Sequence, residues 1–430
     1  MSVGCRVKKI RISSGERFPL LVHSFTGMPL WSPTIFVMTE LRASNCASLT
    51  LLQATRAIMV GYRVLAHLAI DIEERINQGR MFELHELDAL VNLAGLEQKA
   101  LDQLTAEPSS HVQKRRQPTF LEKARMRIKA GHQPSVVAPG TKAIRLLYLR
   151  DYLQWLAKRK LLSLDHTDPM RRALSDSASE FVERINTRMP PTKSQGLYEA
   201  REGLDPEIER RIREVVNPNS PENPWKNNHV RTRNHLVIEL LLALGLRRGE
   251  LLGLKLTDID LRSSHLLIRR RADDPEDLRR DEPATKTRSR SLAISSELAE
   301  LVRAYIQGAR RANKGSRLHP FLIVANGTGA PLTTSGISKI FDELRDRVPD
   351  LPNDLSPHVL RHTWNERFSE LMDERGVAPE EEEKLRRQQM GWSDKSKMTA
   401  VYTRRHVRKK ADEASLAHQS KIYRFDTGRK

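Results

Sequence analysis

The chain has 430 residues, enough for two domains, and carries 73 Lys and Arg against 54 Asp and Glu, a formal net charge of +19. This excess predicts a polyanionic partner, nucleic acid first, although ribosomal-type and membrane-surface proteins share such a charge. Its two cysteines cannot build a disulfide framework or a four-thiolate zinc site, so we expect thiols in a reducing compartment.

The first 44 residues predict a small N-terminal appendage of strands and loops, with three prolines between apolar stretches. No long apolar h-region opens the chain, and no run of about 18 apolar residues follows. We therefore expect neither a secretory signal nor a membrane helix, and a cytoplasmic, nucleoid-associated protein.

Residues 45–185 predict a basic domain made mostly of helices. From Ser48 onward, apolar residues recur at spacings of three and four, the period of a helix packed on one face. Residues 186–203, with two adjacent prolines and no apolar period, predict an interdomain linker. Further helices of this domain are expected near 84–104, 119–130 and 140–160.

Residues 204–410 predict a second domain of helices and a small sheet, so the chain as a whole should be mostly α with a small β-sheet (α+β). Asp205 and Pro206 have the residue types of an N-cap and a first helical turn. The run 236–244 is apolar nearly all round, which predicts a buried helix that ends at Gly245. Strands are expected at 261–270 and 289–294, on either side of an acidic stretch, and helices at 296–312, 335–346, 357–371 and about 399–417.

Two segments of the second domain carry arginines suited to a phosphate. Arg247 follows the buried helix, and its planar guanidinium can donate two hydrogen bonds to nonbridging oxygens. Ser356 and Pro357 predict a helix start that places His358 and Arg361 in the first turn. Unpaired amides and the helix dipole favour an anion there. Taken singly, each of these residues also suits a structural helix cap.

Two further segments carry a lysine and an indole. Lys286 lies in a basic turn between the two expected strands, where a lysine can donate a proton to a leaving oxygen. By itself, such a turn is more often a solvated basic loop. Trp392 follows Gly391, and its indole N–H is a hydrogen-bond donor only.

Tyr402 is the favoured candidate for a nucleophile among seven tyrosines. A phenol has a pKa near 10, so it attacks poorly unless cations stabilise its oxyanion, and Tyr402 lies in a basic run. Tyr305 falls on an apolar helix face and is expected in the core, and Tyr423 in the tail is the alternative nucleophile. The remaining tyrosines are assigned to packing in the N-terminal domain or to the linker: Tyr62, Tyr148, Tyr152 and Tyr198.

In their order along the chain, these segments resemble the tyrosine recombinases, also called phage integrases. The resemblance spans roughly residues 200–410, about half the chain. Many members carry histidine where this chain has Trp392, and ten residues separate Trp392 from Tyr402 (402 − 392), one more than in common members. The matching elements are a Gly-Leu-Arg-x-x-Glu box, a hairpin lysine, a His-x-x-Arg pair, a Gly-Trp pair and a late tyrosine, at Arg247 with Glu250, Lys286, His358 with Arg361, Gly391 with Trp392, and Tyr402.

The resemblance implies a chemistry as well as a fold. The helical domain would clamp the far side of a DNA duplex, while Arg247 and Arg361 would hold the scissile phosphate. Tyr402 would attack it to form a 3′-phosphotyrosine and release a 5′-hydroxyl, which Lys286 would protonate. His358 would act as acid or base, and the Trp392 indole would bond the phosphate. Because the covalent link conserves the bond energy, no cofactor, ATP or metal is expected.

The implied function is that of a site-specific recombinase that integrates or excises a mobile element. Its expected partners are double-stranded DNA, three further copies in a homotetramer on paired sites, and accessory DNA-bending or directionality proteins. A type IB topoisomerase-like relative and a non-catalytic DNA-binding regulator derived from an integrase are the alternatives. Residues 411–430 are expected to form a tail helix that docks on a neighbouring protomer or packs on its own domain.

Overall fold

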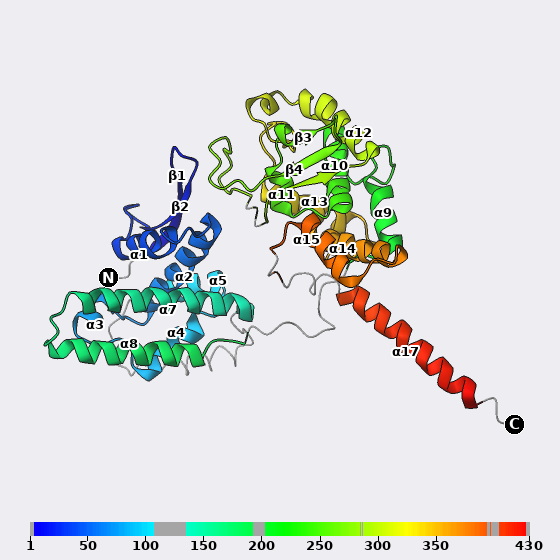
Figure 1. Ribbon diagram of the computed structural model, residues 1–430. Helices are drawn as coiled ribbons and strands as arrows, with labels where there is room; N and C mark the ends of the chain where they lie inside the picture. The colour runs from blue at the N-terminus through cyan, green and yellow to red at the C-terminus, as the bar shows by residue number, and fades with distance from the viewer. Residues whose placement is uncertain are drawn as a thin grey trace. The chain divides into compact units, whose positions relative to one another are not determined.

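The computed structural model describes residues 4–106, 135–191, 203–283, 285, 287–393, 396 and 404–426. The chain forms two compact units (Figure 1). Unit 1 comprises Met1–Ile12 and Arg17–Ser194, and unit 2 comprises Ser13–Glu16 and Gln195–Lys430. Helices dominate the described residues, which also hold a two-stranded and a three-stranded sheet. The expected class, mostly α with a small β-sheet, is confirmed, while the finer boundaries at 44, 185 and 203 stay predictions.

Unit 1 is a helical body with one antiparallel hairpin, formed by β1 (Cys5–Arg11) and β2 (Arg17–His23). A π-helical turn, Val37–Arg42, continues its first helix. Its described helices are α1 (Trp31–Phe36), α2 (Ser48–His67), α3 (Ile72–Asn77), α4 (Leu84–Leu93), α5 (Gln98–Ala106), α7 (Pro139–Leu162) and α8 (Pro169–Thr187).

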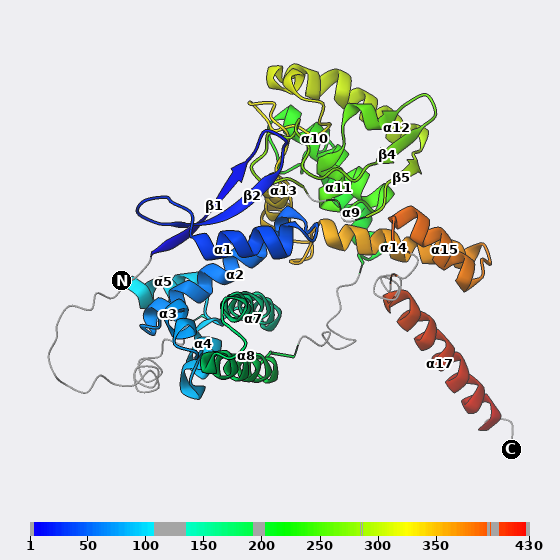
Figure 2. The same ribbon diagram turned by 60° about the vertical axis from the view of Figure 1, so that its left-hand side comes forward.

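The core of unit 1 lies where α2 packs on α7 and α7 packs on α8. Helices α7 and α8 run side by side in both ribbon views (Figures 1 and 2). Apolar residues from all three helices fill the core, since their stripes recur at the helical period. Phe18 and Leu21, from the segment predicted as an appendage, are buried in this same core, and the Phe36 ring meets that of Tyr152 edge-on at 5.4 Å. Residues 4–44 therefore include structural parts of unit 1.

Unit 2 combines helices with the antiparallel sheet β3-β4-β5. Short 3-10 turns occupy Leu256–Asp258 and Lys314–Leu318, and a π-helical turn occupies Ile306–Arg310. Its described strands are β3 (Ile259–Asp260), β4 (His265–Ile268) and β5 (Arg290–Ala293). Its described helices are α9 (Pro206–Val216), α10 (Asn228–Leu244), α11 (Arg248–Gly253), α12 (Ser296–Tyr305), α13 (Thr334–Arg347), α14 (Pro357–Glu374), α15 (Pro379–Met390) and α17 (Arg404–Asp426).

The centre of unit 2 is α10, which packs against α9, α12 and α14 (Figure 1). Its apolar residues face these neighbours on every side, so Val237, Ile238, Leu240 and Leu241 are fully buried. The expected buried helix at 236–244 is thereby confirmed. Because α10 is fixed in the core, its C-terminal end is a rigid platform for the residues that follow it.

Several helices of the structure were not expected from the sequence, among them α1 and α3 in unit 1 and the longer α8 and α15. The segment of α1 was predicted as strands and loops. In α8, the buried residues Leu174, Phe181 and Ile185 do follow a helical period, so that signal was present. In α15, rich in Glu and Arg, the buried residues are Arg386 and Met390, so no apolar stripe marks it. The helix expected at 84–104 is two helices, α4 and α5, and that expected at 119–130 lies outside the described residues.

The acidic stretch between β4 and β5 is anchored to the body of unit 2. Asp274 Oδ2 pairs with Lys255 Nζ at 2.6 Å. The buried Arg279 guanidinium donates to the carbonyls of Leu252 and Leu332 at 3.0 and 2.8 Å. These contacts hold the segment that precedes Thr287 and strand β5 against the body of unit 2.

Candidate active site

Arg247 stands at the junction between the buried helix α10 and the short helix α11. Gly245 ends α10 in the left-handed conformation, with φ of 59°, as its glycine predicted. A Cβ there would come within 2.9 Å of the Trp364 ring, so the close approach also requires glycine. Arg247 then caps α11, and its backbone N–H donates to Glu250 Oε2 at 3.0 Å. The Arg247 side chain is thus held at the edge of the core.

Glu250 is a carboxylate with a fully buried side chain. It accepts hydrogen bonds from the Thr287 hydroxyl at 2.5 Å and from Arg290 Nη2 at 3.0 Å. Burial alone would raise the pKa of Glu250, but the charges of Arg290 and Arg361 and these hydrogen bonds outweigh it and lower the pKa to about 2. Glu250 is therefore charged at any physiological pH.

Three arginines surround this one carboxylate. Besides Arg290, Arg247 Nη1 lies 3.5 Å from Glu250 Oε1, and Arg361 Nη1 lies 4.0 Å from Oε2. Arg361 Nη1 also donates to the Gly245 carbonyl at 2.5 Å, which ties α14 to the end of α10. Three cations against one anion leave a local excess of positive charge, which is the electrostatic condition for holding a phosphate.

The first turn of α14 carries His358 and Arg361, as expected from Ser356 and Pro357. Ser356 Oγ accepts from the Val359 N–H at 3.5 Å, so the predicted N-cap is confirmed. Arg361 is buried, whereas His358 is exposed. His362, one turn on, places its Nε2 3.3 Å from His358 Nε2, and the two rings meet edge-on at 4.7 Å. In that contact one nitrogen donates and the other accepts, so His362 can fix the tautomer of His358.

Trp392 reaches the same region from the end of α15. Gly391 ends that helix with φ of 65°, and the buried indole packs on Met390 and Trp364. The Arg361 guanidinium carbon lies 5.7 Å from the Trp392 ring centre. The Trp392 ring therefore lies beside the buried Arg361.

Arg290 joins these segments to the sheet. Its Nε donates to the Gln389 carbonyl at 2.6 Å, while its Nη atoms bind Glu250. Two residues earlier, the Arg288 N–H donates to the Gly391 carbonyl at 3.0 Å. Arg290 therefore holds the end of α15 and the start of α11 in a fixed relation.

Arg386 fixes α15 on α14 from inside the unit. The side chain is fully buried, and it donates to the Asn365 carbonyl at 2.7 Å and to Ser369 Oγ at 2.6 Å. It also pairs with Glu382 one turn away. This network sets the position of the helix end from which Trp392 projects.

A small hollow of about 190 Å³ opens beside Trp392. Four cationic side chains line it, namely Arg288, Arg290, Lys384 and Arg387. No carboxylate lines it among the described residues. The approach to the arginine cluster is therefore electropositive as well.

Lys286, Tyr402 and the side chain of Tyr423 lie outside the described residues. The structure thus brings together Arg247, His358, Arg361 and Trp392 of the predicted set, and the placement of the lysine and the nucleophile stays a prediction. Tyr305 is buried in the core, as expected, and burial raises its pKa to about 12. A phenol in that position is a poor nucleophile.

Sequence reasoning missed Arg290 and Thr287 as parts of this site. A signal for Arg290 exists in the strand pattern, because it shares a strand face with the buried Leu292 and Ile294. A charged residue at an inward position of a strand requires a partner. Nothing local identifies that partner as Glu250, which is 40 residues away.

In the part of the chain that the structure describes, no group of three or more His, Cys, Asp or Glu side chains is arranged to hold a metal ion. The same part contains no helix that is long and apolar enough to cross a membrane.

Comparison with known proteins gives matches to the part of the chain that carries the candidate active site. Residues 219–409 match the model of the phage integrase family. The tyrosine recombinase XerC of Pelotomaculum thermopropionicum is 26% identical over 235 residues, covering 54% of this chain and 62% of that protein. XerC of Bacillus licheniformis is 30% identical over 134 residues, covering 31% of this chain and 39% of that protein.

The chain spans less than two thirds of the length of the first curated relatives that it matches, 62% and 54%. Among solved structures, it is similar to that of the XerH site-specific recombinase bound to a palindromic difH substrate in a post-cleavage complex. The TM-score is 0.40 and the identity 13%, and the match covers 85% of this chain and 97% of that one.

Proposed function

Residues 219–409 of this chain belong to the phage integrase family, and from that premise we propose that the protein is a site-specific DNA recombinase. It breaks and rejoins double-stranded DNA through a 3′-phosphotyrosine link, and so integrates or excises a mobile element in the cytoplasm. The relatives named as tyrosine recombinases support this proposal.

The observation that carries the proposal is the convergence of separate segments on Glu250. Arg247 and Arg361, from α10–α11 and α14, lie within 4.0 Å of its oxygens, and Arg290 from β5 binds it directly. Trp392 covers Arg361 from the end of α15. A regulator that only binds DNA would have no use for a phosphate cradle built from so many parts of the chain.

In the proposed reaction, Arg247 and Arg361 hold the nonbridging oxygens of the scissile phosphate. The guanidinium fork matches those oxygens in shape and charge, and it stabilises the extra negative charge that develops on phosphorus substituents in the transition state. The indole N–H of Trp392 adds a third donor. Glu250 and Arg290 do not touch the phosphate in this scheme; they keep the two arginines in place.

The Tyr402 oxygen forms a bond to phosphorus as the bond to the 5′ oxygen breaks. The phenolic proton passes to His358, and Lys286 gives a proton to the departing 5′ oxygen, so charge and protons balance. The phosphodiester is exchanged for a phosphotyrosine diester of similar energy. The reverse attack by a 5′-hydroxyl of a second duplex completes strand transfer, without ATP or metal.

Strand exchange between two duplexes requires four active sites, so the proposal includes a homotetramer on paired sites. The tail helix α17 is held to α14 by an ion pair of 3.0 Å between Lys410 and Asp373. It leaves Val407, Leu416 and Ile422 largely exposed. This apolar exposure supports docking of the tail on a neighbouring protomer. Accessory DNA-bending or directionality proteins complete the set of proposed partners.

The test is a recombination assay with two duplex plasmids that carry the end sequences of the mobile element. Wild-type protein should exchange strands, and Tyr402→Phe should abolish exchange while it keeps wild-type affinity for the end duplex. If strand exchange persists in Tyr402→Phe, the nucleophile is not Tyr402, and Tyr423 becomes the candidate.

A supercoiled plasmid without the end sequences distinguishes the topoisomerase-like alternative. A recombinase leaves that plasmid supercoiled, whereas a type IB topoisomerase relaxes it. Binding without exchange or relaxation by the wild type would favour the regulator.

A further inference from the structure

Arg233, in the second turn of α10, is a buried cation that lines a cavity. It forms no ion pair with a carboxylate of the described residues, and the charge of Glu343 acts on it without direct contact. Its Nε and Nη2 both donate to the Asn234 side-chain oxygen, at 2.9 and 2.8 Å, and its Nη1 lies 3.4 Å from the Val324 carbonyl. Burial lowers its pKa below the ordinary value for arginine. A buried charge with only neutral partners is costly, which points to an anion that joins it.

Other buried arginines of unit 2 have a fuller set of hydrogen-bond or ion-pair partners for the guanidinium group. Arg279 pairs with Asp277 at 2.8 Å, and Arg386 pairs with Glu382. Arg310 has no ion pair among the described residues, but three backbone carbonyls, of Phe321, Ser316 and His319, accept from it at 2.9 to 3.1 Å. Arg233 differs from all three because two of its donors share one amide oxygen and its guanidinium borders open space.

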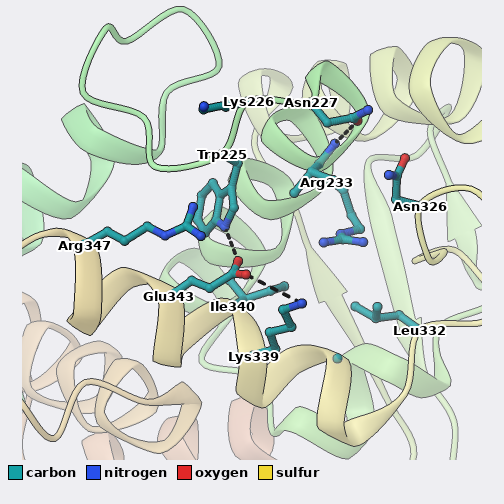
Figure 3. Close-up of a pocket in the computed structure, with 12 residues that line it drawn as sticks. Trp225, Lys226, Asn227, Arg233, Asn326, Leu332, Lys339, Ile340, Glu343 and Arg347 are labelled. Carbon is teal, nitrogen blue, oxygen red and sulfur yellow. Dashed lines mark hydrogen bonds and ion pairs between the residues drawn. The ribbon is translucent and has the colours of Figure 1, made fainter.

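That space is a hollow of about 550 Å³ between the start of α10 and α13. Figure 3 shows the Arg233 guanidinium lying between Asn326, Leu332 and Lys339. Lys226, Lys339 and Arg347 also line the hollow, against one carboxylate, Glu343. Glu343 already accepts the Trp225 indole N–H at 2.7 Å and lies 3.8 Å from Lys339 Nζ. Four cations against one engaged anion make the hollow electropositive.

The walls restrict the ligand further. Val230, Leu332 and Ile340 give the hollow apolar sides below its charged rim. A ligand that suits both parts presents anionic oxygens to the cations and a less polar body to the walls. A sugar–phosphate unit has that construction, whereas a bare inorganic anion would leave the apolar walls uncovered.

The hollow adjoins the candidate active site through α13. Arg248, the residue after Arg247, donates to Ser338 Oγ at 3.4 Å, and Ser338 precedes Lys339. The same unit therefore carries the arginine cluster and the hollow on elements that contact one another, α11 and α13.

We propose that this hollow is a second phosphate site, in which Arg233, Lys339 and Lys226 bind a phosphodiester of the DNA backbone away from the scissile bond. The proposal rests on the DNA-directed function argued above. It assigns Arg233 to positioning of the duplex, and its expected signature lies in the salt dependence of binding.

The experiment measures the affinity of full-length protein for an end-sequence duplex by fluorescence anisotropy over a range of salt concentrations. Each phosphate contact contributes roughly −0.9 to the slope of log affinity against log salt. Lys339→Ala, an exposed substitution, should make that slope shallower by roughly one contact. Lys314→Ala, an exposed lysine of unit 2 that does not line the hollow, is the matched control and should leave the slope unchanged.

The second variant is Arg233→Lys, which keeps the positive charge but loses the planar guanidinium and its paired hydrogen-bond donors. It should weaken duplex binding several-fold, with thermal unfolding used to confirm that the variant is folded. An unchanged slope in Lys339→Ala, or a slope lowered as much by Lys314→Ala, would overturn the site.

A third arm separates the sources of phosphate. Thymidine monophosphate and inorganic phosphate are added to the free protein, and the midpoint of thermal unfolding is recorded. A shift that Lys339→Ala removes, together with an unchanged duplex slope, would overturn the assignment to DNA in favour of a free phosphate ester. Formation of the covalent protein–DNA adduct by the wild type is measured in parallel. If the second phosphate site is disproved while the adduct still forms, the proposed recombinase function is unaffected.

Discussion

The two units of this protein bury very different interiors. In the described residues, the buried polar or charged side chains of unit 1 are Arg17, Ser32 and Thr55, and its core is otherwise apolar and aromatic. Unit 2 buries many more, including Glu250, Arg290 and Arg361. Apolar burial stabilises a fold by itself, but buried charge costs desolvation and needs partners. The difference indicates that unit 1 rests mainly on apolar packing, whereas unit 2 also maintains buried charges that depend on their partners.

Within unit 2, the buried arginines again divide into two kinds. Arg290 and Arg361 lie against Glu250, whereas Arg233 contacts no carboxylate in the part of the chain that the structure describes. The first kind holds a site together and leaves a surplus of positive charge. The predictions below test that division, starting with the carboxylate that Arg247, Arg290 and Arg361 share.

Glu250→Gln should produce the largest loss of stability. The amide keeps the shape but removes the negative charge, so that the buried Arg290 and Arg361 lose the counter-charge of Glu250. Breaking a buried pair in this way costs about 3–5 kcal/mol. Chemical unfolding of unit 2 measures this loss, with Glu374→Gln, at an exposed position, as the control. If Glu250→Gln lowers the free energy of unfolding no more than Glu374→Gln does, the Glu250 carboxylate does not stabilise the arginine cluster.

Acid should weaken the wild type through the same group. The pKa of Glu250 in the folded protein is about 2, below the 4.5 of an unperturbed glutamate. Its contribution to stability is therefore complete above pH about 5 and is lost as the pH falls toward 2. Unfolding free energies measured between pH 6 and pH 2 should fall more steeply for the wild type than for Glu250→Gln. Equal slopes would contradict the assigned pKa.

Arg361→Lys should slow DNA cleavage by roughly 10²–10³-fold at saturating protein, as expected when one preorganised transition-state donor is lost. Lysine keeps the charge but cannot reproduce the two-donor fork. Single-turnover cleavage of an end-sequence duplex gives the rate. Arg375→Lys, at the exposed end of α14, is the matched control and should cleave normally. Normal cleavage by Arg361→Lys would remove Arg361 from the phosphate cradle.

Tyr62→Phe in unit 1 should have the smallest effect. The hydroxyls of Tyr62 and the buried Tyr152 lie 2.7 Å apart, so the change leaves Tyr152 without this bond and costs about 1 kcal/mol. Cleavage by the fully bound enzyme should be unchanged. Tyr148→Phe, a partly buried tyrosine, is the control for thermal unfolding. A cleavage defect in Tyr62→Phe would show that unit 1 takes part in the chemistry.

The sequence predicts those features that depend on neighbouring residues. Gly245 as the end of α10, the helix start at Ser356 and Pro357, and the buried position of Tyr305 all follow from local patterns, and the structure confirms them. The alternation at β5 and the period of α10 likewise place the core. These local signals are enough to predict the class of fold and to identify the residues of the sequence motifs.

The sequence does not predict which charged residues are buried together. Arg290 and Glu250 are 40 positions apart, and Arg386 lies in a helix whose composition resembles a solvated surface. Arg233 follows a run of polar residues and gives no sign that it faces a hollow. Such partnerships arise from tertiary packing, so only the folded chain reveals them.

The most direct test of the recombinase account is covalent trapping with nicked suicide duplexes that carry the element's end sequences, in the presence of EDTA. Wild-type protein and Tyr423→Phe should each form a denaturation-resistant protein–DNA adduct, and Tyr402→Phe should form none. An adduct that persists in Tyr402→Phe, or that appears only when divalent metal is restored, would contradict metal-free phosphotyrosine chemistry at Tyr402.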